Sequence, residues 1–403
     1  MVISMKGKSK KIIHQMINIR RDLHENPELS GEEYETSKKI QQVLTKYGIP
    51  FEAGFAKTGV LGIIKGAKPG KTVALRADID ALPITEQTNL PFSSKMNGKM
   101  HACGHDAHTA MLLGAGILLN EVKDSLQGTI LLVFQPAEEN APSGGAAKMM
   151  EDGVFSTYTP DVIIGQHVWP DLPVGNIGVK PGPIMANSDR FKVVIKGEGG
   201  HASMPHQAID AVIVANQVIT SLQTIVSRNV DPVDSAVITI GKIEGGYRYN
   251  VIADMVTLEG TVRTFTNETK QLIKEKFYQV VTGIVQSMGA KVEIQYMDGY
   301  PATVNTPIWA DQIKETATNL FGKNSTPRVE PCMGGEDFGR FLQKYPGVFY
   351  WLGTSIGEGQ KPLHDPQFMV NEDALPYGIE LMAQAAIDIL KKLNDKKESV
   401  VHE

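Results

Sequence analysis

The sequence predicts an α/β protein in which one domain is inserted into another. Three observations predict this fold. Strand-like apolar runs alternate with helical segments between residues 60 and 165, which is the pattern of a layered α/β domain. Residues 191–297 follow the order strand, helix, strand, strand, helix, strand, as in a ferredoxin-like unit. Helix–strand alternation resumes after Pro301, so the first domain is expected to continue there.

These patterns give a discontinuous first domain and a continuous insertion. We expect residues 1–187 and 301–403 to form a domain with a central mixed sheet flanked by helices, and residues 188–300 to form the inserted α+β domain. The insertion, at roughly 110 residues, has the length of an independent domain. Pro181-Gly-Pro183 marks the change of texture between the two parts.

Within the first domain, apolar spacing predicts the elements in order. Residues 9–48 are expected to be helical, with a break at Asn26-Pro27 and an end at Gly48. Strands are expected at 60–64, 73–77, 129–134 and 162–165, and helices at 107–122 and 145–152. Open α/β sheets bind ligands at the edge where their strands end. Side chains that follow these strands are therefore the candidates for a functional site.

The inserted domain is predicted from the same spacing rules. Strands are expected at 191–196, 236–244, 255–264 and 291–297, with helices at 208–227 and 268–288. A glycine-rich turn covers residues 197–200.

Composition excludes several classes of function. The formal net charge of −5, from 40 basic and 45 acidic side chains, gives no basic footprint for nucleic acid or for an anionic membrane. No apolar run is long enough to span a bilayer. The two cysteines give no disulfide framework, and the basic start lacks the features of a secretory signal. We expect a cytoplasmic protein that binds neither nucleic acid nor membrane.

The segment His101-Ala-Cys-Gly-His-Asp-Ala-His108 is the richest in metal-ligand chemistry. Cys103 and His105 are close enough in sequence to reach one zinc-like ion, and a thiolate has lone pairs to bridge two ions. Cys103 is alternatively a small buried hydrophobe, although its polar, glycine-containing surroundings do not predict deep burial, or a nucleophile. His101 and His108 are expected as outer hydrogen-bond partners or helix caps.

Three distant segments add further ligand types: Glu138-Glu139 after the run 129–134, His167 after the run 162–165, and His364. One carboxylate of the glutamate pair can hold a metal while the other takes the proton of a water that the metal acidifies. Taken alone, the pair also fits the start of a helix, and each histidine also fits a hydrogen-bonded core position. A site assembled from separated loops is typical of catalytic metal centres.

Several further polar residues are candidates for supporting roles. Asp78 and Asp80 end a predicted strand, and Asp80 is the preferred partner to orient a ligating histidine. His201, in a glycine-rich loop of the inserted domain, can stabilise an oxyanion. Asn250 and Arg263 can hold a substrate carboxylate, while Arg263 also fits an ordinary strand surface. Glu336 and Asp337 fit either site acids or helix-start charges.

The motifs together resemble the aminoacylase/carboxypeptidase family of co-catalytic metallohydrolases, in the branch that contains hippurate hydrolases and thermostable carboxypeptidases. The resemblance runs from about Arg20 to about Gly378. It implies that the inserted domain is a lid that often mediates dimerisation. It implies Glu138 as general base and His201 as the lid histidine. It also implies two divalent ions, with Cys103 bridging them, held by Cys103, His105, Glu139, His167 and His364.

The expected function is therefore metal-dependent hydrolysis of the amide bond of N-acyl amino acids, with release of a free amino acid. A metallocarboxypeptidase acting on short or N-blocked peptides is the alternative within the class. A non-catalytic metal-dependent binding protein is the alternative outside it, and the intact Glu138 argues against that interpretation. Zinc suits the ligand types, while cobalt, manganese and nickel also fit. A homodimer or homotetramer is expected.

Overall fold

The structure is a computed structural model that describes residues 3–400, with side chains through Asp395. It divides the chain into two compact units. Unit 1 runs from the first described residues to Ile184, continues over Thr303–Glu330 and resumes at Asp337. Unit 2 comprises Met185–Ala302 and Pro331–Glu336. The short segment Pro331–Glu336 thus belongs to unit 2, whereas the sequence patterns placed it in the first domain.

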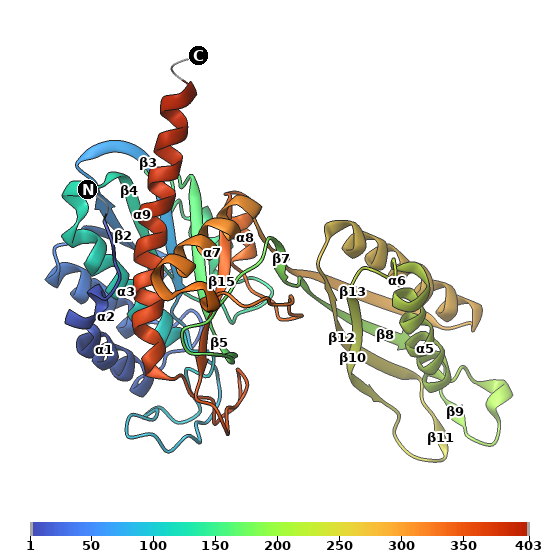
Figure 1. The fold of residues 1–403 in the computed structure, drawn as a ribbon. Coiled ribbons are helices and arrows are strands. Elements are labelled where there is room, and N and C mark those ends of the chain that lie inside the picture. Colours follow the sequence, from blue (N-terminus) through green and yellow to red (C-terminus); the bar gives the residue numbers. More distant parts are fainter. Residues whose placement is uncertain (1–2, 401–403) are drawn as a thin grey trace. The chain divides into compact units, whose positions relative to one another are not determined.

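Unit 1 is built on a seven-stranded mixed sheet with the strand order β1-β2-β4-β3-β5-β15-β6 (Figure 1). Strands β4, β3, β5 and β15 run parallel to one another in this order, while β1, β2 and β6 pair antiparallel. The strands are β1 Phe51–Phe55, β2 Gly59–Lys65, β3 Lys68–Asp78, β4 Gln127–Gln135, β5 Val162–Pro173, β6 Ile177–Gly178 and β15 Gly347–Ser355; β7 Gly182–Met185 and β14 Thr303–Asn305 form a separate pair.

Helices α3 and α9 pack against each other and against the central strands β3 and β4. Helix α3 is buried on every side over its first four turns, because its residues are small or apolar almost throughout. The helices of unit 1 are α1 Ile13–Glu25, α2 Tyr34–Lys46, α3 His105–Glu121, α4 Gly145–Glu151, α7 Pro307–Phe321, α8 Gly339–Leu342 and α9 Leu375–Val400, with 3₁₀ turns η1 Lys8–Lys11, η2 Lys123–Ser125, η4 Lys323–Ser325 and η5 Glu372–Ala374.

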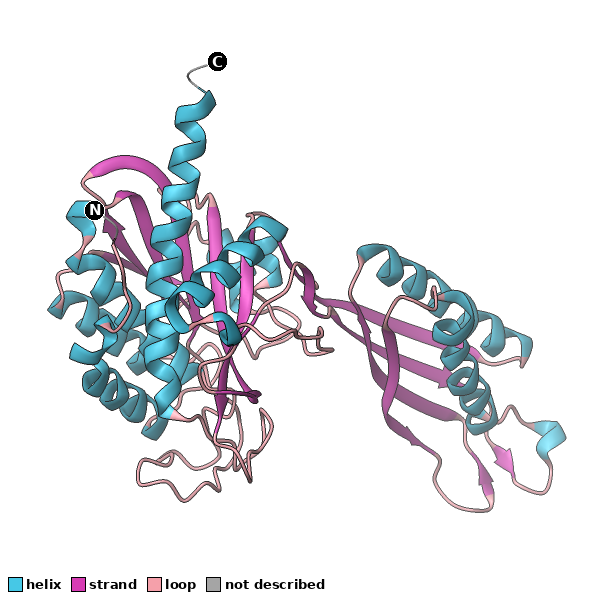
Figure 2. Ribbon diagram, in the orientation of Figure 1, coloured by secondary structure: helices cyan, strands magenta, loops and turns pink. Residues whose placement is uncertain are grey.

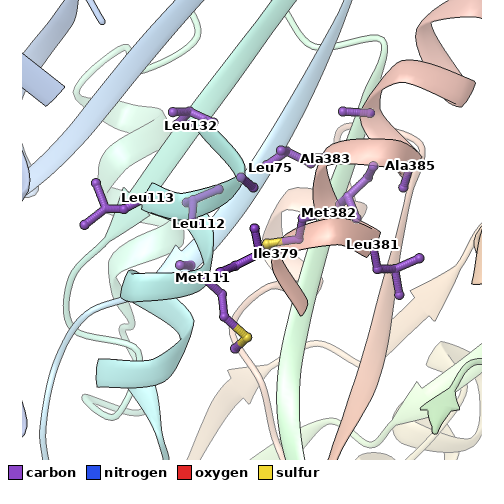
Figure 3. Close-up of a cluster of buried hydrophobic side chains, with 14 of the residues drawn as sticks. Leu75, Met111, Leu112, Leu113, Leu132, Ile379, Leu381, Met382, Ala383 and Ala385 are labelled. Atoms are coloured by element: carbon purple, nitrogen blue, oxygen red, sulfur yellow. The ribbon is translucent and has the colours of Figure 1, made fainter. Parts of the chain in front are cut away.

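The core of unit 1 lies between these two helices and the sheet. Figure 3 shows Met111 of α3, Ile379 and Met382 of α9 and Leu75 of β3 among the buried side chains of this core. The helices approach so closely that a Cβ added at Gly378 would lie 2.2 Å from the Met111 sulfur. A side chain at this point of α9 would therefore force Met111 to move, because the interior is packed as densely as an organic crystal. This packing holds the start of α3 rigidly at the sheet.

Unit 2 is a four-stranded antiparallel sheet, in the order β10-β12-β8-β13, with α5 and α6 packed together on one face (Figure 2). Its chain order β8-α5-β10-β12-α6-β13 is the predicted ferredoxin-like order. A separate antiparallel pair of short strands, β9 with β11, extends this unit, although α5 and β10 lie between the two strands in the sequence. The elements are β8 Ser188–Lys196, β9 Gly200–His201, η3 Pro205–Gln207, α5 Ala211–Asn229, β10 Ala236–Gly245, β11 Val251–Ile252, β12 Met255–Thr264, α6 Asn267–Ser287 and β13 Lys291–Tyr300.

The elements predicted from apolar spacing are present, and the differences lie at their ends. Helix α3 begins at His105 and not at residue 107, because Gly104 adopts φ 80° and turns the chain directly into the helix. Strand β5 extends to Pro173, well beyond residue 165. Short strands such as β9 and β11 have no periodicity to detect. In the described part of the chain, no helix is both long and apolar enough to cross a membrane.

Candidate metal centre

Ligand-type side chains from four separate segments of unit 1 meet at the ends of its strands. Cys103 and His105 stand at the start of α3, Glu138 and Glu139 follow β4, and His167 lies within β5. The fourth segment is the loop that carries His364 before η5. Groups of these ligand atoms lie within 4.8 Å of one another. The structure therefore brings together all the side chains that the sequence suggests as metal ligands.

The Cys103 sulfur lies close to the ring nitrogens of two histidines. Its Sγ lies 3.4 Å from His167 Nε2 and 3.3 Å from His364 Nε2. Two ligands of one tetrahedral zinc ion, at about 2.3 Å for sulfur and about 2.1 Å for nitrogen, lie about 3.6 Å apart, so the observed separations suit shared ions. Cys103 is only 7% exposed, so the expectation that its polar surroundings would keep it from burial was wrong. The start of α3 carries it into the interior.

His105 is fixed by Asp80. Its Nδ1 donates to the Asp80 carbonyl oxygen at 2.9 Å and lies 3.2 Å from the Asp80 carboxylate. The opposite nitrogen, Nε2, is buried without a hydrogen-bond partner among the described residues. Asp80 in turn accepts from Ser30 Oγ and from the Glu139 backbone N–H. Asp80 thus lies where it can orient His105, and it leaves one nitrogen of that ring directed into the cluster.

His167 and His108 have different hydrogen-bonding states. His167 Nδ1 donates to its neighbour's carbonyl, Val168 O, at 2.7 Å, which leaves Nε2 facing Cys103. His108 uses both ring nitrogens, because Nδ1 donates to Asp78 at 2.5 Å and Nε2 accepts from the Val168 N–H at 2.8 Å. His108 therefore has no lone pair left for an ion, which agrees with the expectation of an outer hydrogen-bond partner.

His364 and Glu139 face each other across the cluster. His364 Nε2 lies 3.2 Å from Glu139 Oε1, yet that buried oxygen makes no hydrogen bond to a described residue. His364 adopts φ 68°, and Ala137, just before the glutamate pair, adopts φ 55°. Left-handed backbone at non-glycine residues costs energy and concentrates at functional sites. The chain is therefore strained at two of the four segments that supply the cluster.

The electrostatics of the cluster favour a bound cation. Burial would lower the pKa of His105, but Asp78, Asp80 and Glu139 raise it to about 10. Burial, Glu139 and Glu138 raise the pKa of the Cys103 thiol well above its usual range. Both shifts report a buried excess of negative charge, which divalent ions neutralise. His105 Nε2 and Glu139 Oε1 make no hydrogen bond to a described residue and are atoms that can donate a lone pair to such ions, so the residues fit a metal centre.

Glu138 is the second acid of the glutamate pair. It is 6% exposed, and its Oε1 accepts from the backbone N–H of Asp337 at 3.3 Å. Its ligand-type atoms lie in one group with His105 and Glu139. A buried carboxylate beside a metal centre, held by a backbone donor, has the placement of a general base.

A fully buried charge network behind the cluster was not predicted from the sequence. Arg76, inside β3, donates to Asp78 at 2.7 Å and to Asp337 at 2.9 Å, and its Nε donates to the Gln135 side chain. From the sequence, Asp337 fitted either an acid of the site or a charge at the start of a helix. The one signal in the sequence is the charged Arg76 in the middle of an apolar strand, where an unpaired charge would be costly.

In unit 2, the structure brings two of the three candidates together. His201 in β9 pairs in register with Val251 of β11, directly after Asn250, and the Ala202 N–H donates to the Asn250 carbonyl. The His201 ring is exposed, and its Nδ1 accepts from the N–H and hydroxyl of Ser203. This fixes the tautomer that carries a proton on Nε2, so His201 presents a hydrogen-bond donor outward.

Arg263 lies at the other end of the same sheet. The strand pair with His201 adjoins the Met255 end of β12, and Arg263 is eight residues further along this strand, or about 26 Å away at about 3.3 Å per residue. Arg263 is half-buried and makes no hydrogen bond or ion pair to another described residue. Burial and the neighbouring Arg190 lower its pKa, while Asp189 opposes this shift.

Comparison with known proteins places this arrangement in a family. Residues 74–388 match the family model for peptidase family M20/M25/M40. The chain belongs to this family. An N-acetylcysteine deacetylase of Bacillus subtilis is 45% identical over 380 residues, covering 94% of this chain and 98% of that protein. Thermostable carboxypeptidase 2 of Saccharolobus solfataricus is 42% identical over 399 residues, covering 97% and 100%.

A solved structure of the M20 family gives the same result. A Bacillus subtilis protein described as a dinuclear metal binding peptidase superimposes with a TM-score of 0.83 at 42% identity, covering 95% of this chain and 99% of that one. These matches confirm the family, the α/β fold and the metallohydrolase class expected from the sequence. The roles of individual site residues and the domain bounds stay predictions.

Proposed function

We propose that this M20 protein hydrolyses the amide bond of N-acyl amino acids and releases the free amino acid. The observation that carries the proposal is the buried Glu138 carboxylate beside the cluster of Cys103, His105, Glu139, His167 and His364. A binding protein needs the ligands but not this second acid. The similarity to an N-acetylcysteine deacetylase, at 45% identity over nearly the whole chain, supports the acyl-amino-acid substrate class.

We infer two divalent ions for each chain. One ion would be held by Cys103, Glu139 and His364, and the other by Cys103, His105 and His167. Cys103 can serve both ions because its Sγ lies within 3.4 Å of His167 Nε2 and of His364 Nε2. Mixed sulfur, nitrogen and carboxylate ligands suit zinc, with cobalt, manganese and nickel as alternatives. The similarity to a dinuclear metal binding peptidase supports the count of two.

The protein groups divide the work of the reaction. When bound, the ions supply an acidified water and positive charge at the substrate carbonyl. Glu138 takes the proton from the attacking water and gives it to the amine that leaves. The His201 Nε2–H, held in the donating tautomer by Ser203, stabilises the negative charge on the carbonyl oxygen. Asp80 keeps the His105 ring in its ligating orientation.

The substrate carboxylate is assigned to Arg263, with Asn250 as the amide that assists in holding the substrate. Arg263 is a half-buried guanidinium without a described partner, and arginine binds carboxylates through two parallel hydrogen bonds. Asn250 has a buried side-chain oxygen that makes no hydrogen bond to a described residue. The roughly 26 Å between the His201 end and the Arg263 end of the sheet exceeds the length of an N-acyl amino acid. One substrate would therefore contact Arg263 of one copy and the His201–Asn250 end of unit 2 of another copy, which favours a homo-oligomer.

A metallocarboxypeptidase that removes C-terminal residues from short or N-blocked peptides is the second candidate. It is supported by the 42% identity to a thermostable carboxypeptidase along nearly the whole chain. Both reactions cut an amide next to a free carboxylate, so the same residues serve either. In keeping with the sequence, we place the activity in the cytoplasm, on small substrates and without nucleic acid or membrane partners.

The test is release of free amino acid from N-acetyl, N-benzoyl and N-benzyloxycarbonyl amino acids and from dipeptides. Each substrate is assayed before chelation, after chelation, and after zinc, cobalt or manganese is restored. We expect release that chelation abolishes and metal restores, fastest with the N-acyl amino acids. Faster release from dipeptides would select the carboxypeptidase. Tight metal binding without any release would select the binding protein, and release that resists chelation but stops on thiol alkylation would select a cysteine nucleophile.

A further inference from the structure

The backbone of Asp337 touches the Glu138 carboxylate. Its N–H donates to Glu138 Oε1 at 3.3 Å, across 199 residues of sequence, and both residues are buried. A backbone donor aimed at one carboxylate oxygen helps to fix the direction in which that carboxylate points. The position of Glu138 therefore depends on what fixes the Asp337 peptide.

The Asp337 side chain anchors that peptide. One carboxylate oxygen accepts from Arg76 at 2.9 Å, the other accepts from the Ala146 N–H at 2.9 Å, and both lie 2.8 Å from Gln135 Nε2. Burial raises the pKa of Asp337, while these donors oppose that shift. Arg76, Gln135 Nε2 and the Ala146 N–H are all donors, so the four hydrogen bonds that they make suit the ionised form of the side chain. Charge-assisted bonds of this kind are the strong ones in a dry interior.

The anchors themselves are rigid. Arg76, Gln135 and Asp337 have no measurable exposure, and Arg76 also contacts Asp78 and Gln135, which fixes the direction of its guanidinium. The start of α4 is pressed against the end of β4 so closely that a Cβ at Gly145 would lie 1.8 Å from the Pro136 carbonyl oxygen. The Ala146 donor is thus held by the same loop that carries Glu138.

We propose that Asp337 is a positioning residue for the proposed general base, with its carboxylate clamped by Arg76, Gln135 and the Ala146 N–H so that its own N–H holds Glu138 Oε1. This inference rests on the proposed function of Glu138. It assigns a mechanistic role to the buried ion pair of Arg76 and Asp337, which would otherwise be only structural. The two acids of the glutamate pair are then held by different residues, because the Glu139 backbone N–H donates to Asp80 while the Glu138 side chain accepts from Asp337.

The experiment is a double-mutant cycle between Asp337→Asn and Glu138→Asp, measured as kcat, KM, bound zinc and melting temperature of the zinc-loaded protein. Asp337→Asn keeps the shape of the side chain but replaces one carboxylate oxygen with an NH₂ group. This NH₂ group would face the N–H donors that now bind Asp337, so we expect the Asp337 peptide to shift. Because a positioned general base contributes about 10²–10⁴-fold, we expect Asp337→Asn alone to lower kcat about tenfold or more. KM and zinc content should be unchanged. In the Glu138→Asp background, where the shortened side chain has already lost the N–H, the further loss should be under about twofold.

Two matched variants separate positioning from general damage. Asp78→Asn changes the other buried carboxylate that accepts from Arg76. We expect it to lower the melting temperature about as much as Asp337→Asn does. It should also weaken zinc retention, because Asp78 contacts His108. Glu380→Gln changes a buried carboxylate that binds Ser9, and should leave kcat unchanged. If Asp337→Asn does not fold, Gln135→Met removes one donor to Asp337 without a change of charge and takes its place.

A failure of the positioning role can be told apart from a failure of the proposed function. Chelator-sensitive hydrolysis by the wild-type protein, together with loss of turnover in Glu138→Gln, establishes the function first. Equal losses from Asp337→Asn in the wild-type and Glu138→Asp backgrounds would then overturn the positioning role. A loss of zinc in Asp337→Asn that accounts for the whole fall in kcat would also overturn it.

Discussion

The functional residues of unit 1 and those of unit 2 are held in opposite ways. In unit 1 the candidate ligands are buried or half-buried apart from the exposed His364, and His105, His167 and Glu138 each have a second contact that fixes their orientation. In unit 2, His201 is exposed on a pair of strands, β9 and β11, that have two residues each. The candidate metal site of unit 1 is thus held in place by its own surroundings, while His201 of unit 2 presents its ring to solvent. We therefore expect mutations of the candidate ligands to change metal content, and mutations of Glu138 or of the unit 2 candidates to change turnover or substrate affinity alone.

The largest expected effect belongs to unit 1. Glu138→Gln keeps the size of the side chain and removes its basicity, so kcat should fall by about 10²–10⁴-fold. Bound zinc should be unchanged, because the five other side chains supply the ligands. Steady-state kinetics and elemental analysis of the same preparation check both points. Near-native turnover in this variant would contradict the assignment of Glu138.

His201→Ala tests whether an exposed residue of unit 2 can matter as much to turnover. Loss of one donor to the developing oxyanion lowers kcat by about 10²–10³-fold, whereas loss of an exposed side chain changes stability by only about 0.5 kcal/mol. His206→Ala, an exposed histidine a few residues further along the same loop, is the control and should behave as wild type. If both variants kept full kcat, His201 would have no part in the reaction.

Mixing variants then tests whether His201 acts between copies. Refolding or coexpressing His201→Ala with Glu138→Gln should restore part of the activity, because one copy supplies the base and the other the histidine. Activity no higher than in either variant alone, in a verified mixed oligomer, would place both residues of one reaction in the same chain.

Cys103→Ala addresses metal binding in unit 1. Replacing even an outer partner of a metal ligand costs about 10–100-fold in affinity, so loss of the shared thiolate should weaken zinc binding by more than about 100-fold. Competition with a chromogenic chelator measures the change. The other cysteine gives the control, since Cys332→Ala lies outside the cluster and should keep the wild-type affinity. Equal affinities of the two variants would remove Cys103 from the metal centre.

Arg263→Ala should give the smallest of these effects. Hydrogen bonds to a charged group contribute about 1.5–3 kcal/mol, so KM for an N-acyl amino acid should rise about 10- to 100-fold while zinc content stays constant. The amide of the same substrate, which lacks the carboxylate, should be affected much less. Arg190→Ala, exposed on the neighbouring strand β8, is the control. An equal rise in KM for the acid and the amide would rule out carboxylate recognition by Arg263.

The same contrast explains what the sequence could predict. The long elements of both units have clear apolar periodicity, and the ligands of unit 1 are of residue types that chemistry restricts, so Cys103, His105 and the glutamate pair were recognisable. Strands β9 and β11 have too few residues to show any apolar periodicity. The burial of Cys103 was missed because it depends on α3, which packs on all sides, and not on the polar residues next to it.

The network of Arg76, Gln135 and Asp337 was invisible for a different reason. Arg76 and Gln135 lie 59 residues apart in sequence, and Gln135 and Asp337 lie 202 residues apart. No local pattern connects them. The parallel pairing of β3 with β4, which places Asp78 beside Gln135, brings Arg76 and Gln135 together. Asp337 reaches both from the turn before α8. Such contacts depend on the register of the sheet, which local patterns do not specify.

The most direct test of metal-dependent hydrolysis is a zinc titration of fully chelated protein, with bound metal and amino-acid release measured on the same samples. We expect no turnover without metal, binding that saturates at about two ions for each chain, and turnover that rises as the ions bind. We further expect Glu138→Gln to bind the same number of ions without turnover. Full activity in metal-free protein, or two bound ions with no hydrolysis of any acyl amino acid or dipeptide by the wild-type chain, would contradict the proposed function.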